Sequence, residues 1–301
     1  MSTETLIRQL RAELDDGGLR GSFLVRDLAT GREIGIDPDI DFPIASLAKV
    51  PLAAVTLDRI RRGELDGATP VEVQPGRSTV PGPAGLTKFR HPARVAIDDL
   101  LYLSVAISDS SASDALYVLT PATEVTRQLR DWGITGIVIR HNAGDLVETP
   151  AERFDRGEVH FAHSLAIGAA TEGRGHAIPQ LDVTRASSGS ARAHVNLLAA
   201  IWCPSTMDES VAVRVRELMA DNLLRQRLAP DFSSDATHWA SKTGTVLNLR
   251  HEVGVVSHAD GSRYAIAALT ESRVPAAVQS EAEVLMARVA RLLRDHLRAT
   301  R

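Results

Sequence analysis

The segment 42–49, with the sequence FPIASLAK, and the apolar run that follows it to residue 60 constrain the fold more than any other stretch. Apolar side chains recur there at helical spacing, at Leu47, Val50, Ala54, Leu57 and Ile60. Ser46 is expected to cap the start of this helix, because its oxygen can accept a hydrogen bond from a free amide one turn later. Pro51 predicts a kink or a tightened first turn close to that serine.

Ser46 and Lys49 are three residues apart, so a helix would place both side chains on one face. A serine hydroxyl becomes a good nucleophile when a neighbouring base takes its proton. A lysine amine can be that base if burial or a nearby cation lowers its pKa. Of the 34 basic residues only three are lysine, namely Lys49, Lys88 and Lys242. Because arginine keeps its proton, the retained lysines indicate positions where a side chain must be able to lose one.

Composition limits the classes of partner and the cellular location. At 301 residues the chain forms one large domain or two. The net charge is −4 and no long basic run occurs, so nucleic acid is not an expected partner. Cys203 is the single cysteine, which excludes an internal disulfide, and no apolar window is long enough to span a membrane. Residues 1–18 have the pattern of an amphipathic helix and lack that of a signal peptide, so we expect a cytoplasmic protein.

Strands are expected at both ends of the chain and helices between them. The first helix should end at residues 16–18, before a hairpin of 22–28 with 33–36. Further helices are expected at 96–107, 112–119, 121–132, 161–170, 191–202, 209–224 and 276–297. Later strands are expected at 239–243, 252–256 and 264–269, a short strand at 137–139, and irregular structure over 64–94. This order predicts an α/β (α+β) fold, in which an antiparallel sheet of about five strands is flanked by terminal helices and carries an inserted helical subdomain.

Two further motifs contain groups that fit acyl transfer. Ser108-Asp109-Ser110 follows the predicted helix 96–107, and its first hydroxyl could pass a proton between a nucleophile, an amine and a leaving group. The alternative is a turn that caps the next helix. The second motif, 241–245 (SKTGT), lies on a predicted strand. There Lys242 adds positive potential, Thr243 can bind a substrate carboxylate, and a glycine lets a substrate lie against the strand edge. The alternative is an edge strand that ends in a glycine turn.

In this order, S-x-x-K, S-D-S and K-T-G resemble the three motifs of class A β-lactamases and the related penicillin-binding proteins. The 62-residue separation of Ser46 and Ser108 is similar to that in the family, and the resemblance extends from the first predicted helix to the last. It implies that Ser46 is the acylated nucleophile, Lys49 the proton acceptor and Ser108 a proton relay.

The resemblance also implies how a substrate would be held. Ser110 would stand where the family has an asparagine amide, and the backbone amides of Ser46 and Thr245 would form an oxyanion hole. A small-molecule substrate with a carboxylate is expected to bind at Lys242, Thr243, Gly244, Thr245 and Arg250, with His251 as the alternative to Arg250. No cofactor and no metal are expected.

The departures from the family pattern concern the second chemical step. Class A enzymes carry a Glu and an Asn four residues apart that hold the deacylating water, whereas Asn is absent here from 143 to 195. Glu148, Glu152 and Asp145 lie in that region, and Glu148 is retained as the candidate base. His141, His160, His163 and His176 lie in the same region and offer another base, but their spacing does not match a zinc site.

We therefore expect a serine hydrolase, most simply one that hydrolyses β-lactams with slow deacylation. The first alternative is a cytoplasmic esterase, amidase or transacylase that acts on a metabolite. The second is a ligand-binding module without turnover. Residues 1–45 and 221–301 are expected to form the sheet subdomain and 46–220 the helical one, with the site at their junction. The sequence leaves the oligomeric state open.

Overall fold

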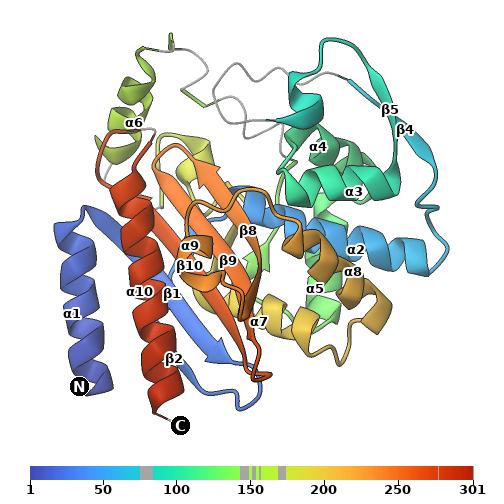
Figure 1. The fold of residues 1–301 in the computed structure, drawn as a ribbon. Helices are drawn as coiled ribbons and strands as arrows, with labels where there is room; N and C mark the ends of the chain where they lie inside the picture. The colour runs from blue at the N-terminus through green and yellow to red at the C-terminus, as the bar shows by residue number, and fades with distance from the viewer. Residues whose placement is uncertain are drawn as a thin grey trace.

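The computed structural model describes residues 1–74, 84–142, 149–150, 154–155, 157–168, 174–276 and 278–300. A five-stranded antiparallel sheet forms one layer, in the order β2-β1-β10-β9-β8 (Figure 1). Its strands are β1 (Leu19–Asp27), β2 (Glu33–Ile36), β8 (Thr237–Val246), β9 (Leu249–His258) and β10 (Arg263–Ser272). Because β1 pairs with β10, the sheet joins the two ends of the chain and leaves β8 at an edge. The predicted fold class is confirmed.

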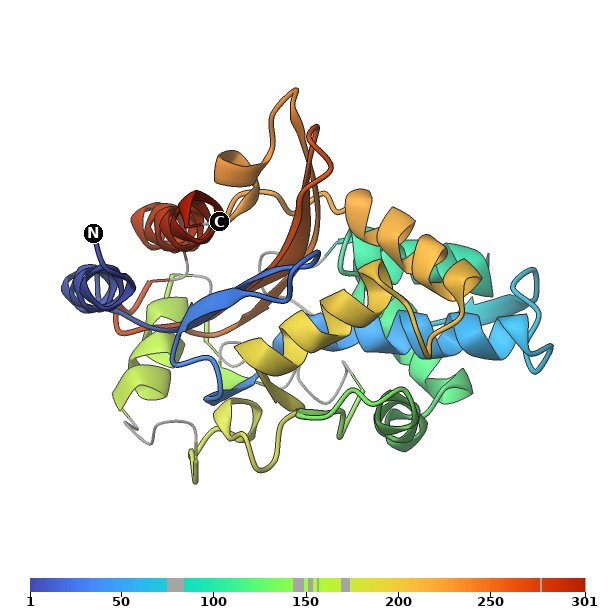
Figure 2. The ribbon, with the colours of Figure 1, turned by 90° about the horizontal axis from the view of Figure 1, so that it is seen from below.

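The two terminal helices, α1 (Thr3–Asp16) and α10 (Ser280–Ala299), lie side by side on one face of the sheet (Figures 1 and 2). Their apolar side chains pack on this face of β1 and β10 in one buried cluster, which includes Leu6, Leu10, Leu14, Phe23, Ile266, Met286, Val289 and Leu293. Both helices show the spacing of a half-buried helix, so the sequence pattern was sufficient to place them.

The other face of the sheet packs against helices of the middle of the chain (Figure 2). They are α2 (Lys49–Arg61), α3 (Ile97–Ala106), α4 (Ser110–Leu119), α5 (Ala122–Asp131), α6 (Val159–Gly168), α7 (Ala191–Trp202) and α8 (Glu209–Ala220). The short α9 (Ala229–Phe232) instead lies beside α10, and its Ala229 and Phe232 belong to the cluster of the terminal helices. All residues of α2 from Lys49 to Asp58 are buried, as expected for a helix without a polar face. None of the described helices combines the length and apolar character needed to cross a membrane.

Short strands accompany these helices. β4 (Pro70–Val73) pairs with β5 (Ala93–Ala96), and β3 (Asp41–Pro43) pairs with β7 (Ser188–Ser190), which also pairs with β6 (Ile137–Val138). The prediction of irregular structure over 64–94 was therefore wrong for β4 and β5. The paired residues of β4 and β5 are between 20 (Val73 with Ala93) and 26 (Pro70 with Ala96) positions apart, so a local sequence pattern gives no sign of the pairing.

Helix α8 ends four residues before its predicted end. Asn222 leaves the helix to donate through its side chain to Ser241 Oγ at 3.1 Å, and the amide of Leu223 donates to the carbonyl of Ala106. These contacts with α3 and β8 replace the last helical turn.

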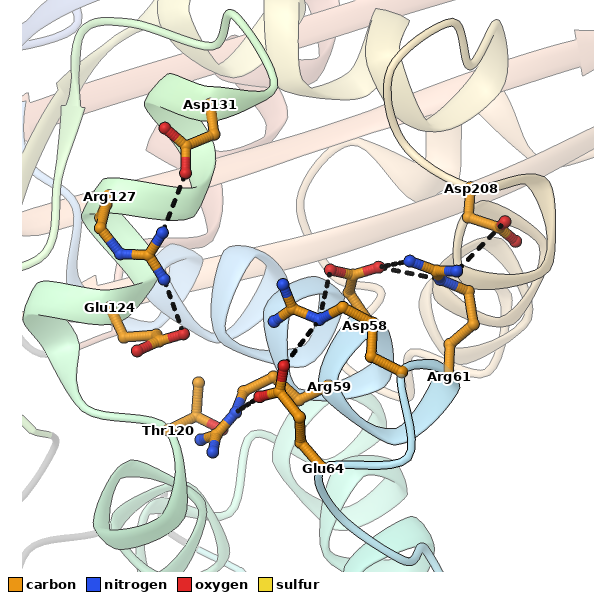
Figure 3. A network of polar contacts seen from close by, with 10 residues as sticks. Asp58, Arg59, Arg61, Glu64, Thr120, Glu124, Arg127, Asp131 and Asp208 are labelled. Carbon is orange, nitrogen blue, oxygen red and sulfur yellow. Dashed lines mark hydrogen bonds and ion pairs between the residues drawn. The ribbon is translucent and has the colours of Figure 1, made fainter.

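Ion pairs hold the end of α2 (Figure 3). The Asp58 carboxylate has only 6% of its side chain exposed and pairs with Arg61 at 3.0 Å and Arg62 at 3.5 Å. Arg59 donates to the Leu119 carbonyl at the turn between α4 and α5. Positive side chains at a helix C-terminus also interact favourably with its dipole. The end of the helix that begins with Lys49 is thus fixed to its neighbours.

Asp58→Asn should lower the free energy of unfolding by about 1–3 kcal/mol, because two arginines lose a buried counter-charge. Urea unfolding measures the change. Asp131→Asn is the matched control, since Asp131 is 54% exposed and pairs with Arg127 at the surface. Its effect should stay within about 0.5 kcal/mol. Equal effects of the two substitutions would contradict the assignment.

Candidate active site

Ser46 lies in a tight 3-10 turn, η1 (Ala45–Ala48), directly before α2. The prediction that Ser46 caps the helix was wrong, because η1 occupies that position and α2 begins at Lys49. Pro51 fits the first turn of α2, and the tightened turn expected near the serine is η1. Ala45 has a φ of +48°, a left-handed conformation that is strained for alanine. The turn leaves Ser46 half-buried, so part of this residue is open to solvent.

Lys49 is 2% exposed and points toward the second motif. Its Nζ donates to the Ser108 carbonyl at 2.6 Å and lies 3.3 Å from Ser108 Oγ and 3.5 Å from Ser110 Oγ. Within the described part of the chain, Lys49 makes no hydrogen bond to Ser46 Oγ. Ser46 of η1 and Lys49 at the start of α2 are therefore close in sequence, and the amine of Lys49 is hydrogen-bonded to Ser108.

The segment 108–110 joins α3 to α4. Ser108 has a φ of +60°, which turns its side chain into the site. The buried Asp109 carboxylate caps α4 by accepting from the amides of Ser111 and Ala112. It also accepts from Thr87 Oγ1 at 2.8 Å, in the 3-10 turn η2 (Gly85–Lys88). The capping alternative is thus confirmed for Asp109, while Ser108 faces the lysines.

Lys242 lies on the edge strand β8 and is completely buried. Its Nζ donates to Ser108 Oγ at 2.9 Å and to the Thr243 carbonyl at 3.0 Å. Ser108 Oγ therefore accepts from two amines whose residues are far apart in sequence. Since both contacts are donated by lysine, the proton of the Ser108 hydroxyl stays available to a third group.

Gly244 is where β8 contacts the turn that carries Ser46. A Cβ on Gly244 would lie 2.8 Å from the Ile44 carbonyl oxygen and 3.1 Å from Leu47 Cγ. Any side chain would push the strand away from η1. The structure thus gives this glycine a packing reason besides the substrate approach expected from the sequence.

Arg227 is a residue that the sequence reasoning missed. It is 3% exposed and reaches the end of β8. Its guanidinium donates to the Gly244 carbonyl at 2.9 Å, the His251 carbonyl at 2.7 Å and Thr245 Oγ1 at 2.6 Å. It also pairs with Glu283 of α10 at 2.9 Å. Arg227 lies in an irregular stretch after α8, where no local pattern marks it.

The arginine and histidine expected to bind a carboxylate both make hydrogen bonds with the backbone. Arg250 is 3% exposed and donates to the carbonyls of Leu247 and Leu249 in the β8–β9 turn. His251 is fully buried between Pro43 and Thr270, and both of its ring nitrogens are hydrogen-bonded. Arg250 lies opposite Thr245 across β8 and β9, and Arg227 is a second arginine there, which donates to Thr245 Oγ1.

The candidate base Glu148 lies outside the described residues, as do Asp145 and Glu152. Two of the four histidines considered are buried. His176 accepts from the Ile178 amide and contacts the Ala166 carbonyl. Burial lowers the pKa of His163 to about 4, so it would be neutral near pH 7. The described residues contain no cluster of three or more His, Cys, Asp or Glu side chains suited to a metal.

Burial and the neighbouring charges both act on the pKa values of the two site lysines. Burial lowers the pKa of Lys49 to about 8, against the carboxylates of Asp109 and Asp114. Burial also holds the pKa of Lys242 well below its ordinary value, with Lys49 and Arg227 acting in the same direction. Because the two amines repel each other, loss of one proton favours retention of the other.

We expect the Lys49 amine to titrate near pH 8 in the folded protein. Lysine labelled with ¹³C at Cε gives three signals to follow by NMR, and Lys49→Arg assigns the relevant one. In the urea-unfolded chain all three should titrate together at about 10.4. A folded Lys49 signal that titrates above pH 10 would show that its amine cannot serve as a base near neutrality.

Comparison with known proteins agrees with this geometry. The profile described as “Beta-lactamase enzyme family” matches residues 5–297. The “Beta-lactamase regulatory protein BlaB” of Streptomyces cacaoi is 60% identical over 309 residues, covering 99% of each chain. In fold, the chain is similar to a β-lactamase from Chitinophaga pinensis, with a TM-score of 0.74, 20% identity and 98% of each chain covered. It is also similar to PBP-A, with a TM-score of 0.74, 17% identity and coverage of 98% of this chain and 96% of that one. The chain belongs to the β-lactamase enzyme family.

Proposed function

We propose that the protein is a serine acyl-transfer enzyme that opens β-lactams by forming an acyl-enzyme at Ser46 and releases the product slowly. The observation that carries the proposal is the contact of Lys49 and Lys242 with one hydroxyl, that of Ser108, beside a half-buried serine on a strained turn. This arrangement supplies a nucleophile, a base, a proton relay and a fixed cation in one place.

In the proposed acylation, Ser46 Oγ attacks the lactam carbonyl carbon. The new C–O bond forms as the Ser46 proton passes to the neutral amine of Lys49, which leaves a tetrahedral oxyanion. The C–N bond breaks when that oxyanion collapses. Lys49 returns a proton through Ser108 Oγ to the departing nitrogen. The amides of Ser46 and Thr245 stabilise the developing oxyanion.

The proposed substrate carries a carboxylate that binds beside Lys242 and Thr243. Lys242 keeps its proton during the reaction, and Arg227 adds positive potential through Thr245. A cation fixed before the substrate arrives attracts an anion without further reorganisation. In this proposal Ser46 and Lys49 of the first motif carry out the bond-forming and proton-transfer steps, and Lys242 and Thr243 of the third motif select the substrate.

Slow release follows from the residues available for the second step. Glu148 is followed four residues later by Glu152 where the family has an asparagine, so a deacylating water would be less well held. The name of the 60% identical relative, a regulatory protein, favours an outcome other than rapid turnover. A mutant of PBP-A, similar in fold, has been solved as an acyl-enzyme complex with penicillin G.

The same relative also favours the second candidate function, a ligand-responsive regulator that binds without turnover. A long-lived adduct would serve either function, because it converts the presence of a β-lactam into a lasting change at Ser46. An esterase or transacylase would instead pass the acyl group rapidly to water, an amine or an alcohol.

A β-lactam should add one mass increment to the protein, on the peptide that contains Ser46. Ser46→Ala should abolish it, and Lys49→Arg should slow it by about 10²-fold or more, the scale of a positioned general base. Intact-mass spectrometry after timed mixing measures both. An undiminished adduct in Ser46→Ala would end the acyl-enzyme proposal.

Stopped-flow with a chromogenic cephalosporin should show a burst of about one equivalent per protein, followed by slow turnover. The slow phase is expected because no asparagine holds the water in place for the base. A general base that acts on a well-placed water contributes about 10²–10⁴-fold to the rate. Glu148→Gln tests whether Glu148 supplies what remains of that step. Rapid turnover with neither burst nor trapped adduct would contradict the proposal.

A further inference from the structure

The peptide group between Pro43 and Ile44 lies directly before the strained Ala45 and is held at both of its ends. Its carbonyl accepts a hydrogen bond from Nε2 of His251, on β9, at 2.9 Å. Its N–H donates to the carbonyl of Ser187, the residue before β7, at 2.9 Å. Rotation of this peptide group would break both hydrogen bonds, so its plane is fixed from two sides. The proposed mechanism uses neither contact.

The two partners of His251 determine the protonation state of its ring. A carbonyl oxygen can only accept a hydrogen bond, so Nε2 carries the proton that is donated to Pro43. A backbone amide can only donate, and that of Thr270 on β10 lies 3.1 Å from Nδ1, so Nδ1 carries no proton. The ring is therefore neutral. Burial lowers the pKa of His251 to about 3, and the neighbouring Arg227 and His194 act in the same direction, against the hydrogen bond to Pro43.

His251 is itself fixed by several neighbours. It is fully buried, and its ring packs edge-on against Phe42 of β3, with the ring centroids 5.9 Å apart. Its own carbonyl accepts from the Arg227 guanidinium at 2.7 Å. The residue opposite His251 on β8 is Gly244, where a Cβ would lie 2.8 Å from the Ile44 carbonyl oxygen. The missing side chain of Gly244 thus lets the segment before Ser46 approach the sheet.

The peptide group that His251 contacts leads into the turn of the nucleophile. The Ile44 carbonyl accepts from the Leu47 amide at 3.0 Å, which closes η1 around Ala45 and Ser46. Because Ala45 has a φ of +48°, this turn persists only where the surrounding structure holds it. Rotation of the preceding peptide group would change the direction in which η1 leaves β3, and the direction of Ser46 Oγ with it.

We propose that His251 positions the nucleophile, because its clamp on the peptide group before Ala45 maintains the turn that orients Ser46. His251 acts through this peptide group and does not touch the reacting atoms, so it is a positioning residue. The effect on acylation rests on the proposed function. The clamp itself can be measured in the whole protein without any substrate.

Two substitutions separate the two contacts of the ring. Glutamine can place its amide nitrogen near the position of Nε2 and donate to Pro43, whereas asparagine can place its oxygen near Nδ1 and accept from Thr270. Amide hydrogen exchange, followed by NMR, should therefore show a crossed result. His251→Asn should speed exchange of the Ile44 amide about tenfold, the scale of one hydrogen bond. His251→Gln should instead speed exchange of the Thr270 amide.

Imidazole ¹⁵N NMR of wild type tests the same clamp, with His251→Gln to assign the signals. The His251 ring should be protonated on Nε2 and unprotonated on Nδ1 at both pH 7 and pH 5. Unchanged exchange of the Ile44 amide in His251→Asn would overturn the proposal. So would a wild-type ring that is charged at pH 5 or carries its proton on Nδ1, which decides the matter even if neither variant folds.

The effect on chemistry is measured as the limiting rate and the half-saturation concentration of acylation, with a cephalosporin and with its methyl ester. His251→Asn should lower the limiting rate by about 10–100-fold, because a small displacement of a nucleophile has an effect of this size. The half-saturation concentration of either compound should stay near the wild-type value. His251→Gln, which keeps the donor to Pro43, should be acylated at least about tenfold faster than His251→Asn.

Equal limiting rates in the two variants would make His251 merely structural and overturn the proposal. A higher half-saturation concentration for the acid alone would show that His251 binds the carboxylate, and would overturn it as well. If wild type is acylated by neither compound, the proposed function fails, and hydrogen exchange still decides whether His251 holds the turn.

Discussion

The site depends on one hydroxyl, that of Ser108, which accepts hydrogen bonds from Lys49 on α2 and Lys242 on β8. Three segments remote in sequence must come within about a hydrogen bond's length of one another for this to occur. Ser108 is held in a left-handed conformation, and Asp109 next to it is fixed by the start of α4 and by η2. The strain at Ser108 is thus sustained by contacts that do not themselves take part in chemistry.

The arrangement of the layers makes this meeting possible. The sheet joins both ends of the chain and places β8 at its edge, where a strand has backbone groups without a neighbouring strand. That edge packs on the turn bearing Ser46, and the approach of Gly244 to Ile44 is close enough to exclude a side chain. Preorganised groups of this kind need no rearrangement when charge develops on a substrate.

The sequence predicted what depends on local pattern and missed what depends on distant contacts. The terminal helices, the hairpin of β1 with β2 and the three motifs carry their own spacing, and they were found. Arg227 was missed, because an isolated charge in an irregular stretch gives no sign of which carbonyl or carboxylate it will meet. The 3-10 turn at Ser46 was taken for a helix cap, since the strained φ of Ala45 has no signature in an alanine. The pairing of β4 with β5 was also missed, because the two strands are too far apart in sequence for a turn motif to indicate it.

In the proposed mechanism the two site lysines need different charge states, although they share a hydrogen-bond partner. As a coupled pair they favour one proton over two, and their surroundings decide which amine holds it. An incoming carboxylate beside Lys242 would favour the proton on Lys242, because a nearby opposite charge stabilises the charged amine. In the proposed mechanism the neutral amine would then be that of Lys49, the lysine nearer the nucleophile in sequence. Binding of an anionic substrate would thereby prepare the base, which links substrate selection at the third motif to proton transfer at the first.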